Sequence, residues 1–212
     1  MTRGMFITFE GGEGSGKSTQ KCRVVAKLRD TGAEVVATRE PGGTELGDRI
    51  RAVLLDRAHV GMQPRAELLL YEASRAELVA SVIRPALERG ATVLCDRYSD
   101  SSIAYQAFGR GLPVDDVREL SELATAGLLP DRTVLLDVAP AVGLARATGG
   151  GADRLESEAV AFHERVRDGF LAIAAEEPDR FRVVDAGQSA DEVALSVAAA
   201  LTDLPCFAGC WW

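Results

Sequence analysis

Apolar residues follow two alternating patterns along the chain. Short apolar runs such as FITF and TVLLDV predict buried strands, whereas stretches with apolar residues every three or four positions predict helices. The predicted strands are residues 5–10, 34–38, 91–96, 133–138 and 181–186. The predicted helices are residues 18–30, 44–56, 64–89, 101–108, 114–126, 157–175 and 191–201, with a short helix before the glycine-rich segment ATGGGADR.

Strands that alternate with helices indicate an α/β fold, in which helices cover both faces of a parallel sheet. Ligands of such sheets bind at the carboxyl ends of the strands. We therefore expect GGEGSGKS, TREPGG, CDRY and DVAP, which each follow a strand, to meet at one edge of the sheet. No repeat or linker divides the chain, so we expect a single domain over 1–212, with a lid at about 146–156 and a tail at about 204–212.

Composition narrows the class of protein. The chain has 212 residues, of which 47% are hydrophobic and 26% charged, and no apolar run approaches the roughly 18 residues of a membrane span. A net charge of −8 argues against a general nucleic-acid surface. The N-terminus lacks a signal-peptide pattern and the four cysteines lack zinc-site spacing, so we expect a cytoplasmic protein with reduced thiols and no membrane or nucleic-acid partner.

Residues 11–18, GGEGSGKS, match the phosphate-binding pattern GxxxxGK[ST] between a predicted strand and a predicted helix. In this motif backbone N–H groups surround the phosphates, the lysine reaches the β and γ oxygens, and the hydroxyl residue holds Mg²⁺. The chain contains no asparagine, which excludes the Asn-Lys-x-Asp element of guanine readers and favours ATP. The expected nucleotide-binding residues are Gly11, Gly12, Glu13, Gly14, Ser15, Gly16, Lys17, Ser18, Thr19 and Arg146.

Three charged residues lie at strand ends, and the two arginines among them indicate a second anion site. Asp96 can hold the magnesium shell together with Ser18, although it could also cap a helix or pair with Arg97. Arg39 and Arg97 can bind phosphate in a bidentate manner. Two anion sites side by side predict transfer to a phosphate acceptor rather than to water.

Residue pairs four apart on helices suggest where the rest of an acceptor would bind. Tyr71 and Arg75 in YEASR could stack on a base and donate to its carbonyl group. In SSIAYQ the pairs are Ser102 with Gln106 and Ser101 with Tyr105. Ordinary core packing is the alternative for each pair, and for Tyr71 alone it is the favoured interpretation.

The P-loop, TREPGGT, DRY followed by SSIAYQ, and a lid segment ending in DRLE occur here in the order found in thymidylate kinases. The chain resembles that family from about residue 5 to 201. The resemblance implies the fold of a P-loop nucleoside-monophosphate kinase, with a five-stranded parallel sheet flanked by helices and a short lid. It also implies a homodimer, with ATP and Mg²⁺ as cofactors and dTMP as acceptor.

The resemblance further implies roles for single residues. Tyr71 would stack on thymine and Arg75 would donate to its O4. Ser102 and Gln106 would lie near N3, and Tyr105 would lie under the deoxyribose. Glu13 would face the sugar 3′-hydroxyl and the magnesium shell, and Arg39 and Arg97 would hold the acceptor phosphate. With Ser101, these complete the expected substrate-binding residues, and the expected catalytic residues are Lys17, Arg97, Arg154 and Glu13.

Gly14 identifies the subtype of the family. Members with arginine at this position supply a catalytic charge from the P-loop, whereas members with glycine supply it from the lid. Residues 149–151 are all glycine and could fold over the site, which would bring in Arg154, while Arg146 would bind ATP. A surface ion pair of Arg154 with Asp153 or Glu156 is the alternative.

The expected reaction is phosphoryl transfer from Mg-ATP to dTMP, giving dTDP and ADP for dTTP synthesis. An ionised acceptor phosphate needs no general base, so His59 and His163 receive no role. The alternatives are a kinase for another nucleoside monophosphate and a P-loop ATPase switch that acts on a protein.

Overall fold

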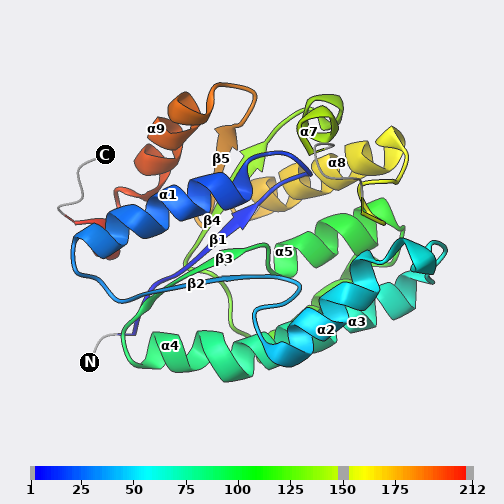
Figure 1. The fold of residues 1–212 in the computed structure, drawn as a ribbon, viewed down its shortest axis with the longest axis horizontal. Helices are drawn as coiled ribbons and strands as arrows, with labels where there is room; N and C mark the ends of the chain where they lie inside the picture. Colours follow the sequence, from blue (N-terminus) through cyan, green and yellow to red (C-terminus); the bar gives the residue numbers. More distant parts are fainter. Residues whose placement is uncertain (1–2, 148–152, 209–212) are drawn as a thin grey trace.

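The structure is a computed structural model that describes residues 3–147 and 153–208. A parallel five-stranded sheet forms its centre, with the strand order β2-β3-β1-β4-β5 (Figure 1). The strands are β1 Phe6–Glu10, β2 Val35–Arg39, β3 Thr92–Asp96, β4 Arg132–Asp137 and β5 Phe181–Asp185. The predicted parallel α/β fold and its five strands are therefore confirmed, with bounds that differ by at most one residue.

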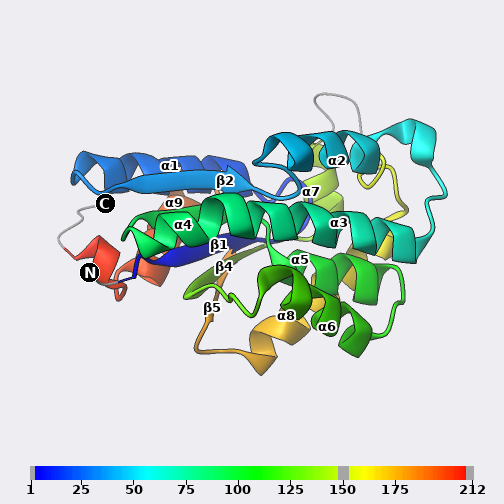
Figure 2. The ribbon, with the colours of Figure 1, turned by 90° about the horizontal axis from the view of Figure 1, so that it is seen from below.

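Helices connect the strands and cover both faces of the sheet (Figures 1 and 2). The α-helices are α1 Lys17–Asp30, α2 Glu45–Leu55, α3 Pro64–Leu78, α4 Arg84–Glu88, α5 Ser99–Ser102, α6 Val114–Thr125, α7 Pro140–Ala147, α8 Val160–Glu176 and α9 Ala190–Leu201. The shorter segments are the 3-10 turns Arg57–His59 and Pro205–Phe207 and the π-helical segments Val79–Ile83 and Ile103–Gly109. Among the described residues, no helix combines the length and apolar character needed to cross a membrane.

Two predicted helices are less regular than the apolar pattern indicates. The predicted helix 64–89 contains the π-helical segment Val79–Ile83 between α3 and α4. Pro85, in the first turn of α4, has no N–H group for the helical ladder. The predicted helix 101–108 begins earlier, at Ser99, and continues as the π-helical segment Ile103–Gly109. Tertiary packing sets these details, which side-chain periodicity does not encode.

Apolar side chains from the two layers of helices meet the sheet in separate clusters. On one face, α1 and α9 pack on β1 and β4 through residues such as Leu28, Val197 and Phe9. On the other face, α3 and α4 pack on β1 and β3, and α8 packs on β4 and β5 together with the segment Ile103–Gly109. Burial of the strands on both faces explains their continuous apolar runs.

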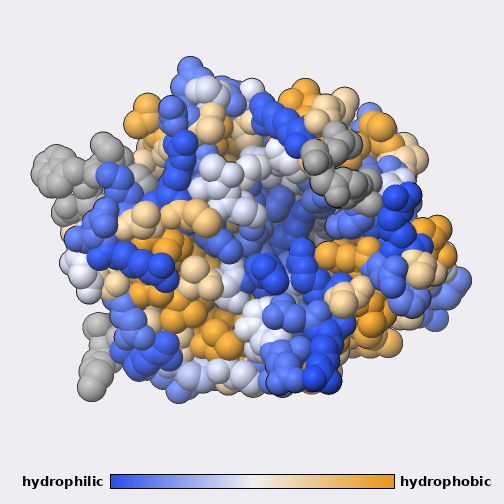
Figure 3. All heavy atoms as spheres, viewed as in Figure 1, coloured by the Kyte–Doolittle hydropathy of each residue, from blue (hydrophilic) through white to orange (hydrophobic). Residues whose placement is uncertain are grey.

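The strand register brings the four motif segments to one edge. Asp96 at the end of β3 pairs in register with Phe9 of β1 and with Arg39 of β2, and Glu10 pairs with Leu135 of β4. The segments after these strands therefore emerge side by side, as the parallel-sheet argument predicts. Seen from the side of Figure 1, the surface has a largely hydrophilic hollow near its centre (Figure 3).

Candidate active site

Residues 11–16 form a tight loop between β1 and α1. Gly16 ends it with φ 89° and precedes the first residue of α1, so a side chain there would be strained. Gly14 has φ 63°, and a Cβ atom on it would lie 1.9 Å from the backbone oxygen of Gly143 in α7. An arginine therefore cannot occupy position 14 unless α7 moves, which explains the glycine in physical terms.

Lys17 is folded back over this loop. Its Nζ donates to the backbone oxygens of Gly11 and Gly12 at 3.1 and 2.6 Å and to Ser15 Oγ at 3.2 Å. Burial and the positive charge of Arg97 lower the pKa of Lys17 to about 8. A phosphate oxygen in the loop would replace these weak acceptors and stabilise the charged amine.

Ser18 and Asp96 face each other across the loop. Ser18 Oγ donates to Asp96 Oδ2 at 2.5 Å, so Asp96 pairs with the loop hydroxyl and not with Arg97. One hydroxyl and one carboxylate suit Mg²⁺, which keeps several of its waters and takes few protein ligands. Among the described residues there is no cluster of three or more acidic, histidine or cysteine side chains that could hold a metal by itself.

Arg97 is fixed at the turn after β3 in a strained conformation. Its φ of 68° is uncommon for a residue with a side chain. The buried carboxylate of Glu10 accepts from the next N–H group, that of Tyr98, at 2.7 Å and from Ser101 Oγ at 2.6 Å. These two hydrogen bonds hold the turn and thereby set the direction of the Arg97 side chain.

The Arg97 guanidinium reaches the P-loop. It donates to Glu13 Oε1 at 2.7 Å and to the Gly11 backbone oxygen at 3.0 Å, and it lies 4.9 Å from the centre of the Tyr105 ring. Tyr105 Oη also donates to Glu13 Oε1, at 2.6 Å. Although burial opposes ionisation, Arg97 and Lys17 lower the pKa of Glu13 to about 2. Glu13 is therefore ionised at neutral pH.

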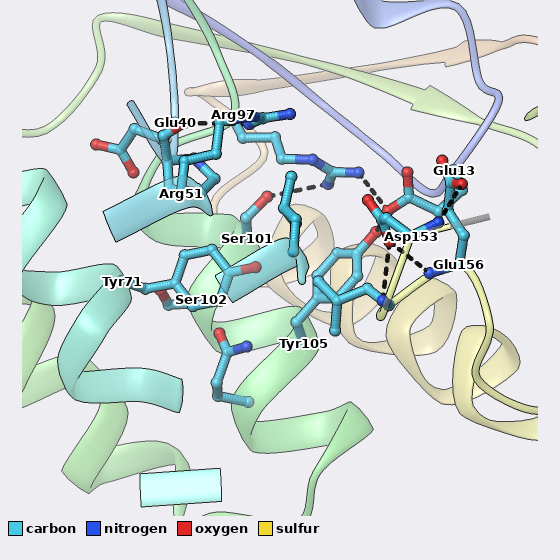
Figure 4. A pocket seen from close by; sticks show the side chains of 14 residues that line it. Glu13, Glu40, Arg51, Tyr71, Arg97, Ser101, Ser102, Tyr105, Asp153 and Glu156 are labelled. Atoms are coloured by element: carbon cyan, nitrogen blue, oxygen red, sulfur yellow. Dashed lines mark hydrogen bonds and ion pairs between the residues drawn. The ribbon is translucent and has the colours of Figure 1, made fainter. Parts of the chain in front are cut away.

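Two adjoining cavities meet at this pair. The first, here called the phosphate pocket, has a volume of about 460 Å³. Its lining residues are Glu13, Gly14, Gly16, Lys17, Ser18, Thr19, Arg39, Glu40, Arg51, Asp96, Arg97 and Arg146. The second, here called the inner cavity, has a volume of about 140 Å³ (Figure 4). Its lining residues are Glu13, Glu40, Pro41, Arg51, Leu55, Tyr71, Arg97, Ser101, Ser102, Tyr105, Gln106, Asp153, Leu155 and Glu156.

The wall between the two cavities carries concentrated charge. Glu13, Glu40, Arg51 and Arg97 line both of them. Groups bound in the two cavities would therefore lie on either side of these four side chains. This is the geometry expected for transfer between two bound molecules.

The family model for thymidylate kinases matches residues 9–197. The chain belongs to the thymidylate kinase family. It is 55% identical to the thymidylate kinase of Deinococcus radiodurans over 96% of this chain and 98% of that protein. It is 53% identical to that of Solidesulfovibrio magneticus, over 91% and 96%. The crystal structure of thymidylate kinase from Ehrlichia chaffeensis has a TM-score of 0.78 and 35% identity, covering 94% of this chain and 99% of that one.

Several of the residues predicted to bind the substrate line the inner cavity. Ser101, Ser102, Tyr105 and Gln106 come from α5 and the π-helical segment that follows, and Tyr71 comes from α3. In Figure 4 Tyr71 and Tyr105 extend toward the same space from these two elements. The sequence thus identified side chains that the fold brings together.

Arg75 lies behind the wall of the inner cavity. It is 1% exposed and donates to Glu40, Glu72, Ser102 Oγ and the backbone oxygen of Tyr98. These acceptors occupy the five N–H groups of the guanidinium. Donation from Arg75 to a base stays a prediction, and it requires one of these hydrogen bonds to be exchanged.

Arg51 is a site residue that the sequence interpretation missed. It lies on α2, lines both cavities, and donates to the backbone oxygen of Pro41 at 3.1 Å. Burial and the nearby charge of Arg39 lower its pKa. Arg39 lines only the phosphate pocket of the two cavities and pairs with Asp48. A signal for Arg51 was available, because α2 directly follows TREPGGT, but nothing local separates it from Arg49, the other arginine of α2.

Arg154 occupies a different environment from either one expected from the sequence. It is 3% exposed, donates from Nε to the Leu54 backbone oxygen at 2.7 Å, and pairs with Glu67 at 2.6 Å. It therefore forms no surface pair with Asp153 or Glu156, and its contacts are to α2 and α3. Its predicted action on a phosphoryl group requires these contacts to break.

Arg146 and the lid complete the site. Arg146 lines the phosphate pocket and donates to the backbone oxygens of Ala186 and Gly187 at 2.7 and 3.2 Å. The glycine run 149–151, on which the predicted lid movement depends, lies outside the described residues, as do residues 209–212 of the predicted tail. From the described end of the lid, Asp153, Leu155 and Glu156 line the inner cavity.

Proposed function

We propose that the chain transfers the γ-phosphoryl group of ATP to dTMP, giving dTDP and ADP for dTTP synthesis. The observation that carries this proposal is the shared wall of the two cavities, where Arg97 lies between the P-loop and the inner cavity. ATP phosphates occupy the phosphate pocket, and dTMP occupies the inner cavity with its phosphate toward Arg97. An oxygen of the dTMP phosphate then faces the γ-phosphorus beside Lys17, and its bond to phosphorus forms as the bond from the γ-phosphorus to the bridging oxygen of ADP breaks.

Catalysis consists of positioning and charge neutralisation. Lys17 leaves its loop acceptors to contact the β and γ phosphate oxygens. Arg97 and Arg51 hold the acceptor phosphate, and ionised Glu13 keeps Arg97 and Tyr105 in place through the hydrogen bonds described above. The acceptor phosphate is already ionised at neutral pH, so no residue has to remove a proton. The role of Arg39 is to bind phosphate at the outer rim of the phosphate pocket.

Mg²⁺ would be held by Ser18 directly and by Asp96 through water, and it would neutralise phosphate charge. The Ser18–Asp96 hydrogen bond supports this assignment, because both oxygens already lie at one point of the phosphate pocket.

The remaining features of the proposal concern the whole molecule. We propose that the chain is a single kinase domain in the cytoplasm, and that it forms a homodimer. Support for a dimer comes from Leu69 on α3 and Leu123 on α6, which are 56% and 78% exposed although α3 and α6 pack against each other. Sedimentation equilibrium measures the mass directly, and a monomer at micromolar concentration would contradict the homodimer.

A coupled assay of ADP release tests the reaction. With Mg-ATP, dTMP should support turnover far better than dCMP, dGMP or dAMP, and ADP formation without an acceptor should be slow. A preference for another monophosphate would indicate a different kinase. Hydrolysis that ignores every monophosphate would indicate an ATPase switch.

A further inference from the structure

We infer, on the basis of the proposed function, that Glu67 fixes the orientation of the Gln106 amide and so makes the inner cavity select a pyrimidine with an N–H group at N3. Glu67 is a positioning residue in this account. It lies on α3 behind the cavity wall and is not among the residues that line the inner cavity.

Glu67 is the acceptor at the centre of a buried network. The residue is 0% exposed, and its Oε1 accepts from Gln106 Nε2 at 2.9 Å and from Arg110 Nε at 3.1 Å. Its Oε2 accepts from Arg110 Nη2 at 3.1 Å and pairs with Arg154 Nη1 at 2.6 Å. Three side chains thus donate to one carboxylate: Gln106 and Arg110 from the π-helical segment and its C-terminal end, and Arg154 from the lid.

The network keeps this carboxylate ionised. Burial alone would raise the pKa of Glu67, but hydrogen bonds from Arg110 and Gln106 and the charges of Arg110 and Arg154 lower it. An ionised carboxylate only accepts hydrogen bonds. The Gln106 side chain must therefore turn its NH₂ group toward Glu67, since the opposite orientation would place two acceptors against each other.

The fixed amide presents one pattern to the inner cavity. Its Oε1 accepts no hydrogen bond from the side chains and backbone of the described residues, and Gln106 lines the inner cavity. An oxygen acceptor beside the second N–H of the amide complements a base edge with N3–H next to a carbonyl oxygen. Thymine and uracil have this edge. Cytosine has an N3 acceptor next to an amino group. Its N3 would therefore face the amide oxygen, acceptor against acceptor, and its amino group would face the amide N–H, donor against donor.

The test compares dTMP, dUMP and dCMP as acceptors at saturating Mg-ATP in Glu67→Gln. A neutral amide at position 67 can donate or accept, so the Gln106 amide is free to turn over. We expect kcat/KM for dTMP and dUMP to fall together, and the ratio of dTMP to dCMP to narrow by about tenfold or more, mainly through KM. The matched control is Glu158→Gln, because Glu158 pairs with Arg110 but does not contact Gln106. The control should keep the wild-type ratio.

A second variant guards against loss of the fold in Glu67→Gln, which leaves the buried Arg154 and the partly buried Arg110 with less negative charge. Gln106→Met removes the amide and leaves Glu67 with both arginines, and it should also narrow the ratio. An unchanged ratio in Gln106→Met, or a parallel fall for all three acceptors in a folded Glu67→Gln protein, overturns the role of Glu67. Absence of dTMP activity in the wild-type enzyme instead contradicts the proposed function, before any variant is compared.

Discussion

The phosphate pocket and the inner cavity are built in different ways. The phosphate pocket takes half of its lining residues from one continuous stretch, residues 13–19. The inner cavity is assembled from α2, α3, α5, the lid and the segment after β2, and buried ion pairs join these parts. A substitution in the phosphate pocket can therefore change catalysis without changing the free energy of unfolding. A substitution around the inner cavity changes both.

Charge pairing shows the same contrast. Lys17 in the phosphate pocket contacts only neutral acceptors, which a phosphate can replace. Around the inner cavity, Arg75 is paired with Glu40 and Glu72, and these carboxylates raise its pKa against the effect of burial. Removing one member of such a set leaves a buried charge without its partner, which lowers the free energy of unfolding.

The largest expected effect concerns Arg97, which belongs to both regions. Arg97→Ala removes the charge between donor and acceptor phosphates, so turnover should fall by on the order of 10³-fold. KM should rise for both nucleotides. Steady-state kinetics with each nucleotide varied in turn measure this. Arg182→Ala is the control, because Arg182 donates to backbone oxygens near β5 and away from both cavities. Near-wild-type turnover in Arg97→Ala would mean that another residue neutralises the charge between the two phosphates.

Arg154 distinguishes a role in stability from a role in chemistry. Arg154→Ala leaves Glu67 paired with Arg110 but removes its shortest ion pair, so the free energy of unfolding should fall by about 1–3 kcal/mol. Urea denaturation measures this loss. Turnover of the folded fraction should fall far less than in Arg97→Ala. The opposite result, unchanged stability with collapsed turnover, would support the lid-arginine role that the sequence predicts.

Arg146 tests the outer part of the phosphate pocket. Its hydrogen bonds are to backbone oxygens near the end of β5, so Arg146→Ala should leave the fold intact. Loss of one charged contact to ATP should raise KM for ATP by about tenfold and leave KM for dTMP unchanged. Titrations of each nucleotide at saturating levels of the other measure both constants. Equal increases would show that the two regions are not independent at this position.

Glu10 is tested through the pH dependence of stability. Burial and the charge of Asp100 raise the pKa of Glu10 to about 8 in the folded chain, from an ordinary value of 4.5. The folded state therefore binds a proton that the unfolded state releases between these values. The contribution of Glu10 to the free energy of unfolding is fully present below about pH 4.5 and is lost as the pH rises through 8.

Urea denaturation at several pH values between 5 and 8 measures this contribution. As the pH rises, the free energy of unfolding of the wild type should fall relative to that of Glu10→Gln, since glutamine does not titrate. Parallel curves for the two proteins would mean that Glu10 titrates alike in the folded and unfolded states.

Periodicity and motifs predicted the fold well because they depend on local rules. The strands, the helices between them and the meeting of the four motif segments follow from continuous apolar runs and parallel connections. The π-helical segments were missed, because side-chain spacing does not reveal a one-residue change in hydrogen-bond partner. The resemblance to thymidylate kinases, carried by ordered motifs, is confirmed by the family match over residues 9–197.

The sequence by itself determined the P-loop, the residues of the phosphate pocket that follow strands, and the family. These depend on contiguous residues whose spacing has one physical use. Only the tertiary structure decided which arginines form buried ion pairs with carboxylates. Arg75 and Arg154 pair with carboxylates on other segments, whereas Arg51 faces both cavities. A guanidinium takes its role from the charge that the fold places beside it, and residues as distant as Glu67 and Arg154 become neighbours only when the chain is packed.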